Sequence, residues 1–237
     1  MVVIITGASR GIGFSTARYF AGMNDFEIYA LSRNSEGLGQ LVNSCAGLNE
    51  SSYIHPLVFD LEWLLQDPSS LHQKLPSTIS HIDILINNAG ALINKPFQQI
   101  SLEEMERIFR VNFFAPAILI RELMPLMGRK GTTHVVNISS MGGFQGSMKY
   151  PGLSYYSASK ASLACMTECL QEEFKESGVA FNCLALGSVQ TEMLDVAFPG
   201  YQAQLKPDEM AEFIGHFALT AHKQMRGKVV PVSVGNP

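Results

Sequence analysis

The sequence predicts an α/β fold with one doubly wound, mostly parallel sheet of seven strands and helices on both faces. Short runs rich in valine, isoleucine and leucine alternate with longer helical patterns from the first residues onward. These runs are continuously apolar, which is typical of parallel strands buried on both faces. A glycine-rich turn joins the first run directly to the first helical pattern, as in a β-α-β unit.

Seven runs are predicted to form the strands of this sheet. They are short, apolar and separated by glycine, proline or polar residues. They lie at residues 2–5, 26–31, 53–59, 82–86, 134–138, 180–184 and 228–234. Since no linker, repeat or low-complexity tract interrupts the alternation, residues 1–237 are expected to form a single domain.

Four longer segments have the features of helices. Residues 12–22 directly follow the glycine-rich turn, and residues 101–127 open with a capping box in which Ser101 and Glu104 satisfy each other's backbone N–H groups. Residues 157–177 carry apolar side chains at helical spacing. Residues 207–220 begin with a proline, whose missing N–H does no harm in the first turn. These segments are predicted to cover the sheet.

The composition is that of a folded protein with a large core. Of 237 residues, 46% are hydrophobic and 16% are charged, so intrinsic disorder is excluded. A net charge of −4 provides no general attraction to nucleic acid or anionic lipid. No run approaches the ~18 apolar residues that a membrane span needs, and residues 1–5 lack the basic segment of a signal peptide. A cytoplasmic location is therefore expected.

The cysteines and histidines show no spacing typical of a metal site, and none is predicted. Cys165 and Cys169 stand one helical turn apart and are expected to be buried free thiols. His134 lies near Ser139 and Ser140, but the sequence contains no Gly-x-Ser-x-Gly turn around a nucleophile. A serine hydrolase is therefore not favoured.

The turn after the first strand is the first candidate binding site. Its glycines let the backbone turn tightly and approach a pyrophosphate, while the next helix directs its N-terminus at the negative charge. The spacing is Gly-x3-Gly-x-Gly without a following Gly-Lys-Ser/Thr, so the turn is not a Walker A loop. The residues of this turn that are predicted to bind a dinucleotide are Thr6, Gly7, Ser9, Arg10, Gly11, Ile12 and Gly13.

The end of the second strand favours NADP(H) over NAD(H). Enzymes that use NAD carry an acidic residue about 20 residues past the glycine turn, where it binds the ribose 2′-hydroxyl. This chain has Ser32 and Arg33 there, and no acid. A guanidinium can hold a 2′-phosphate that a carboxylate would repel, and Arg10 is placed to help from the turn. The alternative is that both arginines are solvated surface charges.

A tyrosine and a lysine, Tyr156 and Lys160, stand four residues apart and hence on one helix face. Such a pair alone is common and usually structural. This pair follows a predicted strand that ends in Ser139 and Ser140, at the edge of the sheet where ligands bind. Tyr155 lacks the four-residue spacing to the lysine, so Tyr156 is the candidate catalytic tyrosine.

Taken together, the motifs resemble the short-chain dehydrogenase/reductase family over nearly the whole chain. The resemblance implies a Rossmann-type fold whose one domain carries both the cofactor site and the substrate site. It also implies that Asn112, Ser140, Tyr156 and Lys160 form a catalytic tetrad. The matching pieces are Thr6-Gly7-x3-Gly11-x-Gly13, Asp60-Leu61, Asn87-Asn88-Ala89-Gly90, Asn112, Ser140 and Tyr156-x3-Lys160.

The same resemblance implies cofactor contacts outside the glycine turn, at the ends of the third, fourth and sixth strands. These contacts are Asp60, Leu61, Asn88, Ala89, Gly90, Gly187, Val189 and Thr191, besides Tyr156 and Lys160. Where the family usually has Pro-Gly after the sixth strand, this chain has Leu186-Gly187. The cofactor carboxamide is still expected to be held there, while the shape of the turn is left open.

The predicted reaction is hydride transfer between a nicotinamide and a carbonyl or alcohol carbon, with Tyr156 as general acid and base. The tyrosine pKa of about 10 must fall by about 3 units, or about 4 kcal/mol, for work near neutral pH. A lysine ammonium ~4.5 Å away supplies roughly 3.7 kcal/mol at an effective dielectric constant of ~20. We therefore expect Lys160 to be nearly sufficient, with the oxidised nicotinamide covering the rest. Ser140 would hold the substrate oxygen, and Asn112, by the resemblance, a relay water near Lys160.

The residues expected to face the substrate are mostly apolar and include no cluster of basic groups, so a small to medium, largely uncharged ketone or aldehyde is predicted. The segment at 192–206, where the family usually has its substrate lid, is short and predicts broad acceptance. The residues concerned are Leu92, Ile93, Phe144, Met148, Tyr150, Leu153, Met193, Leu194 and Phe198.

The resemblance also implies a homodimer or homotetramer paired through the helices at 101–127 and 157–177. Phe113, Phe114 and Ile120 would then lie either in that interface or against the sheet. Two other functions stay open. One is a non-catalytic NADP(H)-binding regulatory protein on the same fold, against which the intact tetrad speaks. The other is an enzyme acting on a nucleotide sugar, for which the chain lacks room for a substrate domain.

Overall fold

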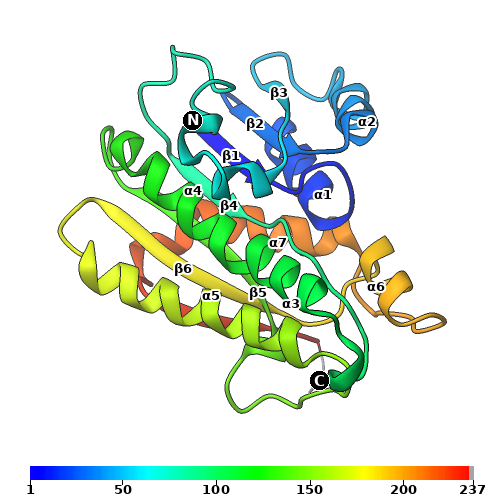
Figure 1. Cartoon of the computed structure of the whole chain (residues 1–237). Coiled ribbons are helices and arrows are strands. Elements are labelled where there is room, and N and C mark those ends of the chain that lie inside the picture. The colour runs from blue at the N-terminus through cyan, green and yellow to red at the C-terminus, as the bar shows by residue number, and fades with distance from the viewer. Residues whose placement is uncertain (235–237) are drawn as a thin grey trace.

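In the computed structural model, which describes residues 1–234, seven strands form one sheet in the order β3-β2-β1-β4-β5-β6-β7 (Figure 1). Every neighbouring pair is parallel, which confirms the predicted fold class. Residues 235–237 of the expected single domain lie outside the described residues. The strands are β1 Val2–Thr6, β2 Glu27–Ser32, β3 Tyr53–Val58, β4 Ile84–Asn87, β5 Thr133–Ser140, β6 Val179–Leu186 and β7 Lys228–Val232.

Within residues 1–234, seven α-helices accompany the sheet, and the sequence predicted neither α2 nor α6. Helix α2 contains two glycines and buries only one side of its first turns, so its apolar pattern is weak. Helix α6 has six residues, and the Thr191 side chain accepts the N–H of Leu194 at its start. The helices are α1 Gly11–Ala21, α2 Ser35–Cys45, α3 Leu102–Phe109, α4 Ala115–Leu123, α5 Ser154–Glu173, α6 Glu192–Ala197 and α7 Pro207–Thr220.

The prediction of one continuous helix over residues 101–127 is wrong. The capping box of Ser101 and Glu104 is present at its start. A π-helical turn, η4 (Arg110–Phe114), then separates α3 from α4, and a 3-10 turn follows α4. Pro116 has no N–H for a preceding carbonyl, and the widened turn puts Asn112 into the interior. Asn112, a candidate catalytic residue, therefore lies where the helix departs from α geometry.

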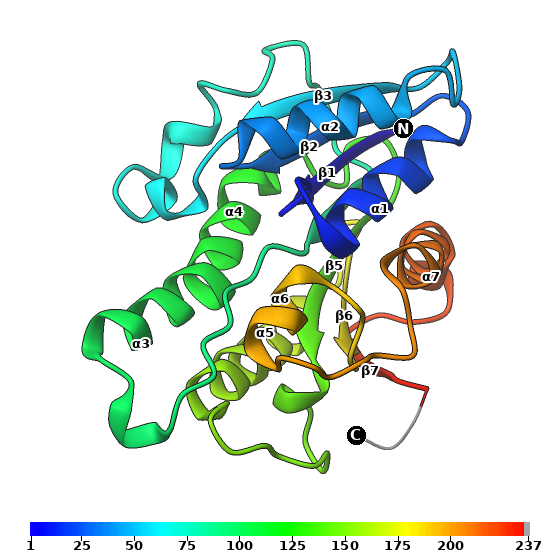
Figure 2. The same cartoon turned by 90° about the vertical axis from the view of Figure 1, so that its right-hand side faces the viewer.

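The sheet is the middle of three layers. Figure 2 shows α1 and α7 on one side of it and α4 and α5 on the other. Successive residues of β1 serve the two sides in turn, since Val3 and Ile5 pack with α1 and α7, whereas Val2 and Ile4 pack with α4. Both faces of the central strands are thus buried, which explains their continuously apolar sequences.

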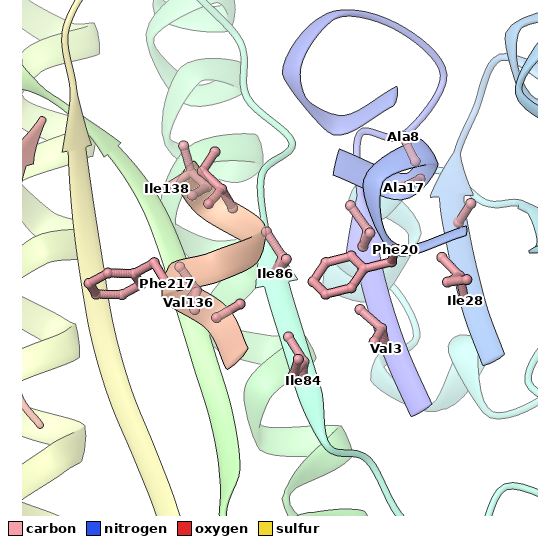
Figure 3. Packing of buried hydrophobic residues seen from close by; sticks show 14 of the residues in the cluster. Val3, Ala8, Ala17, Phe20, Ile28, Ile84, Ile86, Val136, Ile138 and Phe217 are labelled. Atoms are coloured by element: carbon pink, nitrogen blue, oxygen red, sulfur yellow. The ribbon is translucent and has the colours of Figure 1, made fainter. Parts of the chain in front are cut away.

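Large side chains fill the layer between the sheet and helices α1 and α7. Figure 3 shows Phe20 of α1 and Phe217 of α7 packed with Val3, Ile86 and Val136 of three strands. Phe20 is fully buried, and burial of one such side chain contributes about 1.5–3 kcal/mol. The rigid layer fixes the start of α1 relative to the ends of β1 and β4.

The strand order changes direction at β1. From β1 the chain proceeds outward to β2 and β3, and then returns to place β4 on the other side of β1. Ligands bind beyond the carboxyl ends of the strands at such a switch point. The glycine turn follows β1 and Asn88 follows β4, so both predicted motifs lie at this point.

The prediction that Cys165 and Cys169 of α5 are buried is wrong. Cys165 and Cys169 are exposed, because α5 turns Lys160, Leu163, Ala164 and Thr167 toward the sheet and presents the opposite side to solvent. The side chain of Ile120 on α4 is buried in the core, whereas Phe114 is exposed. Of the helices in residues 1–234, none combines the length and the apolar character needed to cross a membrane.

Candidate active site

The turn between β1 and α1 has the geometry of a phosphate-binding loop. Gly7 and Gly11 have φ angles of 70° and 54°, a region that favours glycine. A Cβ on Gly7 would lie 2.8 Å from the Cα of Ala89, and one on Gly13 would overlap the carbonyl oxygen of Gly7. The side chain of Arg10 does not cap α1, so the N–H groups of its first turn are available to an anion.

Thr6 and Asn88 join the ends of β1 and β4. The Thr6 hydroxyl accepts the backbone N–H groups of Asn88 and Ala89, each at 3.0 Å. The Asn88 side chain returns two hydrogen bonds, to the carbonyls of Thr6 at 3.0 Å and Gly7 at 3.3 Å. The sequence predicted that these residues contact the cofactor. In the structure, their hydrogen bonds hold the backbone at the end of β1 to the backbone at the end of β4.

Ser9, Ser32 and Arg33 meet at the end of β2. The hydroxyl of Ser32 donates to that of Ser9 at 2.8 Å, which ties the glycine turn to the second strand. Arg33 pairs with Asp60 at 3.9 Å while its side chain is 60% exposed, and Arg10 is exposed on the turn. The sequence predicted these residues at one site but not the ion pair. A pair so exposed is weak, so the guanidinium is free to turn to a stronger anion.

A cavity of about 290 Å³ borders the glycine turn, between α1 and the segment after β6. Thr191 reaches it, and its methyl group lies 3.3 Å from where a Gly11 Cβ would be. Two carboxylates, Glu192 and Asp195, also line it and would repel a pyrophosphate. The uncapped N–H groups of α1, and not this cavity, therefore fit the phosphates. Gly187 and Val189 lead into the same segment, where the Gly187 N–H donates to the Val232 carbonyl at 2.8 Å.

The candidate catalytic hydroxyls come from β5 and α5. Ser140 is the last residue of β5, and its Oγ accepts the Gly142 N–H at 3.2 Å. Tyr156 lies in the first turn of α5, and the Ser140 side chain acts on its phenol in the direction that lowers its pKa. The strand end fixes one hydroxyl and the helix the other, so the two oxygens face the same point.

Lys160 lies one turn further along α5 and is 4% exposed. Its Nζ donates to the Ile138 carbonyl at 2.8 Å, and its own carbonyl accepts from Ser139 at 2.8 Å. Of the two adjacent serines, Ser139 thus holds the helix to β5, whereas Ser140 faces the tyrosine. This division of roles agrees with the choice of Ser140 as the catalytic candidate.

Asn112 is fully buried and its amide is held from three sides. Its Oδ1 accepts the Ala91 N–H at 2.7 Å, and its Nδ2 donates to the Ala91 carbonyl and to Ser159, each at 2.9 Å. A Cβ on Gly90 would lie 3.4 Å from the Lys160 Nζ and 3.5 Å from the Asn112 Oδ1. The lysine and the asparagine therefore reach one place beside Gly90.

The sequence reasoning missed Ser159, which links Asn112 to the catalytic helix. Its hydroxyl donates to the carbonyl of Tyr156 at 2.7 Å and receives the Asn112 amide. A serine three residues after the tyrosine is a weak signal, because serines are common on helix surfaces. It also missed Cys183 of β6, which is fully buried and acts electrostatically on Lys160.

Burial dominates the proton equilibria of the site. It lowers the pKa of Lys160 to about 8, although Cys183 acts in the opposite direction. Burial also raises the pKa of Tyr156, and the hydrogen bond from Ser140 offsets part of this effect. In the chain by itself the pKa of Tyr156 therefore lies above its ordinary value, contrary to the expectation that Lys160 is nearly sufficient to lower it.

The nine residues expected to face the substrate lie in three segments of the chain. Met148 and Tyr150 are exposed and Leu153 is buried, while the other six are half-buried. The segments are the chain after β4, the chain between β5 and α5, and the chain that includes α6. A half-buried apolar lining suits an uncharged substrate.

A family model described as short chain dehydrogenase matches residues 1–202. The chain belongs to the short-chain dehydrogenase/reductase family. Among relatives in this family, ketoacyl reductase HetN of Nostoc is 37% identical over 192 residues, which cover 81% of this chain and 64% of that protein. Fatty acyl-CoA reductase Rv0547c of Mycobacterium tuberculosis is 32% identical, with 90% and 71% coverage. A third relative, mouse dehydrogenase/reductase SDR family member 7B, is covered over 58% of its length, so the chain spans about three fifths of the first relatives.

Solved structures of the family superpose over almost the whole chain. Levodione reductase has a TM-score of 0.86 at 21% identity, covering 98% of this chain and 95% of that one. A putative NAD(P)-dependent gluconate 5-dehydrogenase from Beutenbergia cavernae, with bound NADP, has a TM-score of 0.84 at 26% identity, with 98% and 94% coverage. A 3-ketoacyl-(acyl-carrier-protein) reductase from Brucella melitensis, complexed with NADH, has 0.82 at 22%, with 99% and 97%. These last two structures hold nicotinamide dinucleotides of both kinds.

Proposed function

We propose that this chain is an NADP(H)-dependent oxidoreductase that interconverts a ketone or aldehyde and the corresponding alcohol. One observation carries the proposal: the Ser140 side chain acts on the phenol of Tyr156, one helical turn from a buried Lys160, at the carboxyl edge of the sheet. A proton donor, an oxygen-binding hydroxyl and a buried cation are what reduction of a carbonyl requires from a protein.

The residues perform the proton half of the reaction. A bound nicotinamide dinucleotide would supply the hydride and, in its oxidised form, a positive charge. Ser140 Oγ and Tyr156 Oη bind the substrate oxygen, and Tyr156 Oη gives its proton to that oxygen as negative charge develops. Lys160 Nζ stabilises the phenolate that remains, and Asn112, whose Oδ1 reaches the same place beside Gly90 as the ammonium, holds a relay water. The reverse sequence oxidises an alcohol.

The preference for NADP(H) is supported by the residues at the end of β2. Arg33 directly follows Ser32 and the exposed Arg10 directly follows Ser9, whose hydroxyls are joined, and no acid takes the place of a ribose ligand at the end of β2. A 2′-phosphate can form paired charged hydrogen bonds with Arg33. These bonds are stronger than the single contact of Arg33 with Asp60 at 3.9 Å. NADP in the related gluconate dehydrogenase structure is consistent with this choice.

The substrate is proposed to be a largely uncharged ketone or aldehyde, and the apolar lining supports this class. The names of two relatives, ketoacyl reductase and fatty acyl-CoA reductase, add acyl carbonyls to the compounds that a screen should contain. A screen in which anionic thioesters alone turned over would contradict the uncharged class.

A homodimer or homotetramer through the faces of α4 and α5 is proposed as well, with the exposed Phe114 at that face, and light scattering tests it.

The test of the function is oxidation of NADPH and NADH by the purified chain with a panel of ketones, aldehydes and acyl thioesters. The wild type should prefer NADPH, and Arg33→Asp should reverse the ratio of kcat/KM between the cofactors by about 10–100-fold, since it exchanges attraction to the 2′-phosphate for repulsion. Tight binding of NADPH without turnover of any carbonyl would favour the regulatory alternative instead. An unchanged cofactor ratio would remove Arg33 from the 2′-phosphate site.

A further inference from the structure

Three segments of the chain meet at Asn94, outside the catalytic residues. The Asn94 Nδ2 donates to the carbonyl of Ala197, the last residue of α6, at 2.8 Å. The next N–H, that of Lys95, donates to the Gly152 carbonyl at 3.1 Å. We call Asn94, Gly152 and Ala197 together the Asn94 bridge.

Gly152 is required for this contact. Its φ angle is 84°, and a Cβ there would overlap the Asn94 Oδ1. A glycine at this position therefore lets the amide of Asn94 lie flat on the chain that leads into α5. Since Tyr156 follows four residues later in the same helix, the bridge has a fixed position relative to the catalytic hydroxyl.

The bridge joins the three segments that carry the proposed substrate-facing residues. Ile93 precedes Asn94, Leu153 follows Gly152, and Phe198 follows Ala197. All three of these neighbours are buried or half-buried, whereas Asn94 itself is exposed. The amide of Asn94 is thus the exposed part of a contact whose neighbours along the chain are buried or half-buried.

Apolar surface continues beyond the bridge. Val196 on α6 is 82% exposed, Phe97 is 63% exposed and Met148 is 59% exposed. Phe97 stacks on Tyr155 with ring centres 5.2 Å apart, which makes a flat apolar surface beside the start of α5. An extended hydrocarbon chain would therefore find apolar contacts beyond the bridge.

We propose that Asn94 determines how long a substrate chain the site accepts, because its hydrogen bond to the Ala197 carbonyl ties α6 to the segment after β4, and both segments carry residues proposed to face the substrate. Short carbonyl compounds fit inside the closed bridge, and longer alkyl or acyl chains require it to open. This inference rests on the proposed carbonyl reductase function and adds a specificity-determining residue to it.

The test compares Asn94→Asp with the wild type on straight-chain aldehydes. Aspartate keeps the shape against Gly152 but presents an oxygen to the Ala197 carbonyl, so the bond is replaced by repulsion. The ratio of kcat/KM for dodecanal to that for butanal should rise about tenfold, with little change for butanal. Asn94→Ala should act in the same direction. Asn49→Asp is the matched control, since Asn49 is an asparagine that bonds Asn24 in a remote surface loop.

An unchanged ratio, or an equal loss for both aldehydes, would overturn the inference while leaving the reductase function intact. A wild type that reduces no carbonyl would instead refute the proposed function. Hydrogen exchange supplies a reading without turnover, because release of Ala197 should speed exchange of the α6 amides, including Asp195 and Phe198, which bond within that helix. Equal α6 exchange in Asn94→Asp, Asn49→Asp and the wild type would show that no closing bond exists.

Discussion

The buried polar groups at the two ends of strand β5 differ in how completely they are hydrogen-bonded. At its start, His134 is 1% exposed and both ring nitrogens are bonded: Nδ1 to the Ala218 carbonyl at 2.8 Å, and Nε2 to Asn182 at 2.9 Å. At its carboxyl end, Lys160 is almost as deeply buried, but it has three N–H donors of which one bonds the Ile138 carbonyl.

This difference predicts which end of β5 contributes to the stability of the fold and which end contributes to the proposed reaction. A buried polar group whose partners are complete joins elements firmly, as Asn182 does by also bonding the Met225 carbonyl and the Lys228 N–H. A buried cation with spare donors costs free energy, and this cost shows as the lowered pKa of Lys160. Such a cost is typical of groups that act on a ligand. Changes at the start of β5 should therefore reduce stability, and changes at its end should reduce activity.

The largest expected effect is on turnover. Tyr156→Phe removes the proton donor and should lower kcat about 10³-fold, because a positioned general acid contributes about 10²–10⁴-fold. The free energy of unfolding should change by less than about 1 kcal/mol, since the lost hydroxyl bonds Ser140 and leaves the packing of the ring in place. Steady-state kinetics and urea unfolding measure the two quantities.

Tyr155→Phe is the matched control for this variant. The Tyr155 ring stacks on Phe97, and its hydroxyl has no place in the proposed proton transfer. Its kcat should equal that of the wild type. If Tyr156→Phe kept full activity, or lost activity only through unfolding, the proposed roles of the two ends of β5 would be wrong.

At the other end of the strand, His134→Leu should destabilise the fold by about 3 kcal/mol. It leaves the Ala218 carbonyl and one N–H of Asn182 buried without their partner, at about 1–3 kcal/mol each. The kcat per folded molecule should be unchanged. His216→Leu on the exposed side of α7 is the control and should change stability by less than about 0.5 kcal/mol. Denaturant midpoints for the two variants decide the matter, and equal values would refute the role of His134.

A smaller effect should appear with pH. Burial lowers the pKa of His134 to about 4 from the ordinary 6.5, and burial lowers that of His222 beside it as well. The unfolded chain therefore binds more protons than the folded chain between about pH 6.5 and 4, and stability is lost as the pH falls through this range. The His134 contribution to the loss should reach about 2 kcal/mol at pH 5.

Urea unfolding at pH 8, 6.5 and 5 measures this loss, and His134→Leu should remove most of it. A variant that lost as much stability as the wild type between pH 6.5 and 5 would show that other groups cause the acid sensitivity. The pH dependence of activity tests the carboxyl end of β5 in the same way. Because the pKa of Lys160 is lowered to about 8, the positive charge that supports the tyrosine declines above that pH.

Local sequence patterns were sufficient for the sheet and for placing the candidate catalytic pair on one helix. Continuous apolar runs identified all seven strands within a few residues, and the four-residue spacing of Tyr156 and Lys160 placed them on one helix face. The weakly apolar α2 was missed, because its two glycines and polar surface hide the pattern that α5 shows. The exposure of Cys165 was also missed, since a helix with apolar and polar residues on several sides does not reveal which side meets the sheet.

The amino-acid sequence alone therefore determined the order of the strands along the chain, the glycine turn and the identity of the catalytic candidates, because these depend on residues near one another in the chain. The tertiary structure alone decided which groups share a point in space: Asn112 with Ser159 and Ala91, Asn94 with Ala197, and Arg33 with Asp60. It also decided the direction of the tyrosine pKa. Burial is a property of the surrounding elements, and no local spacing encodes it.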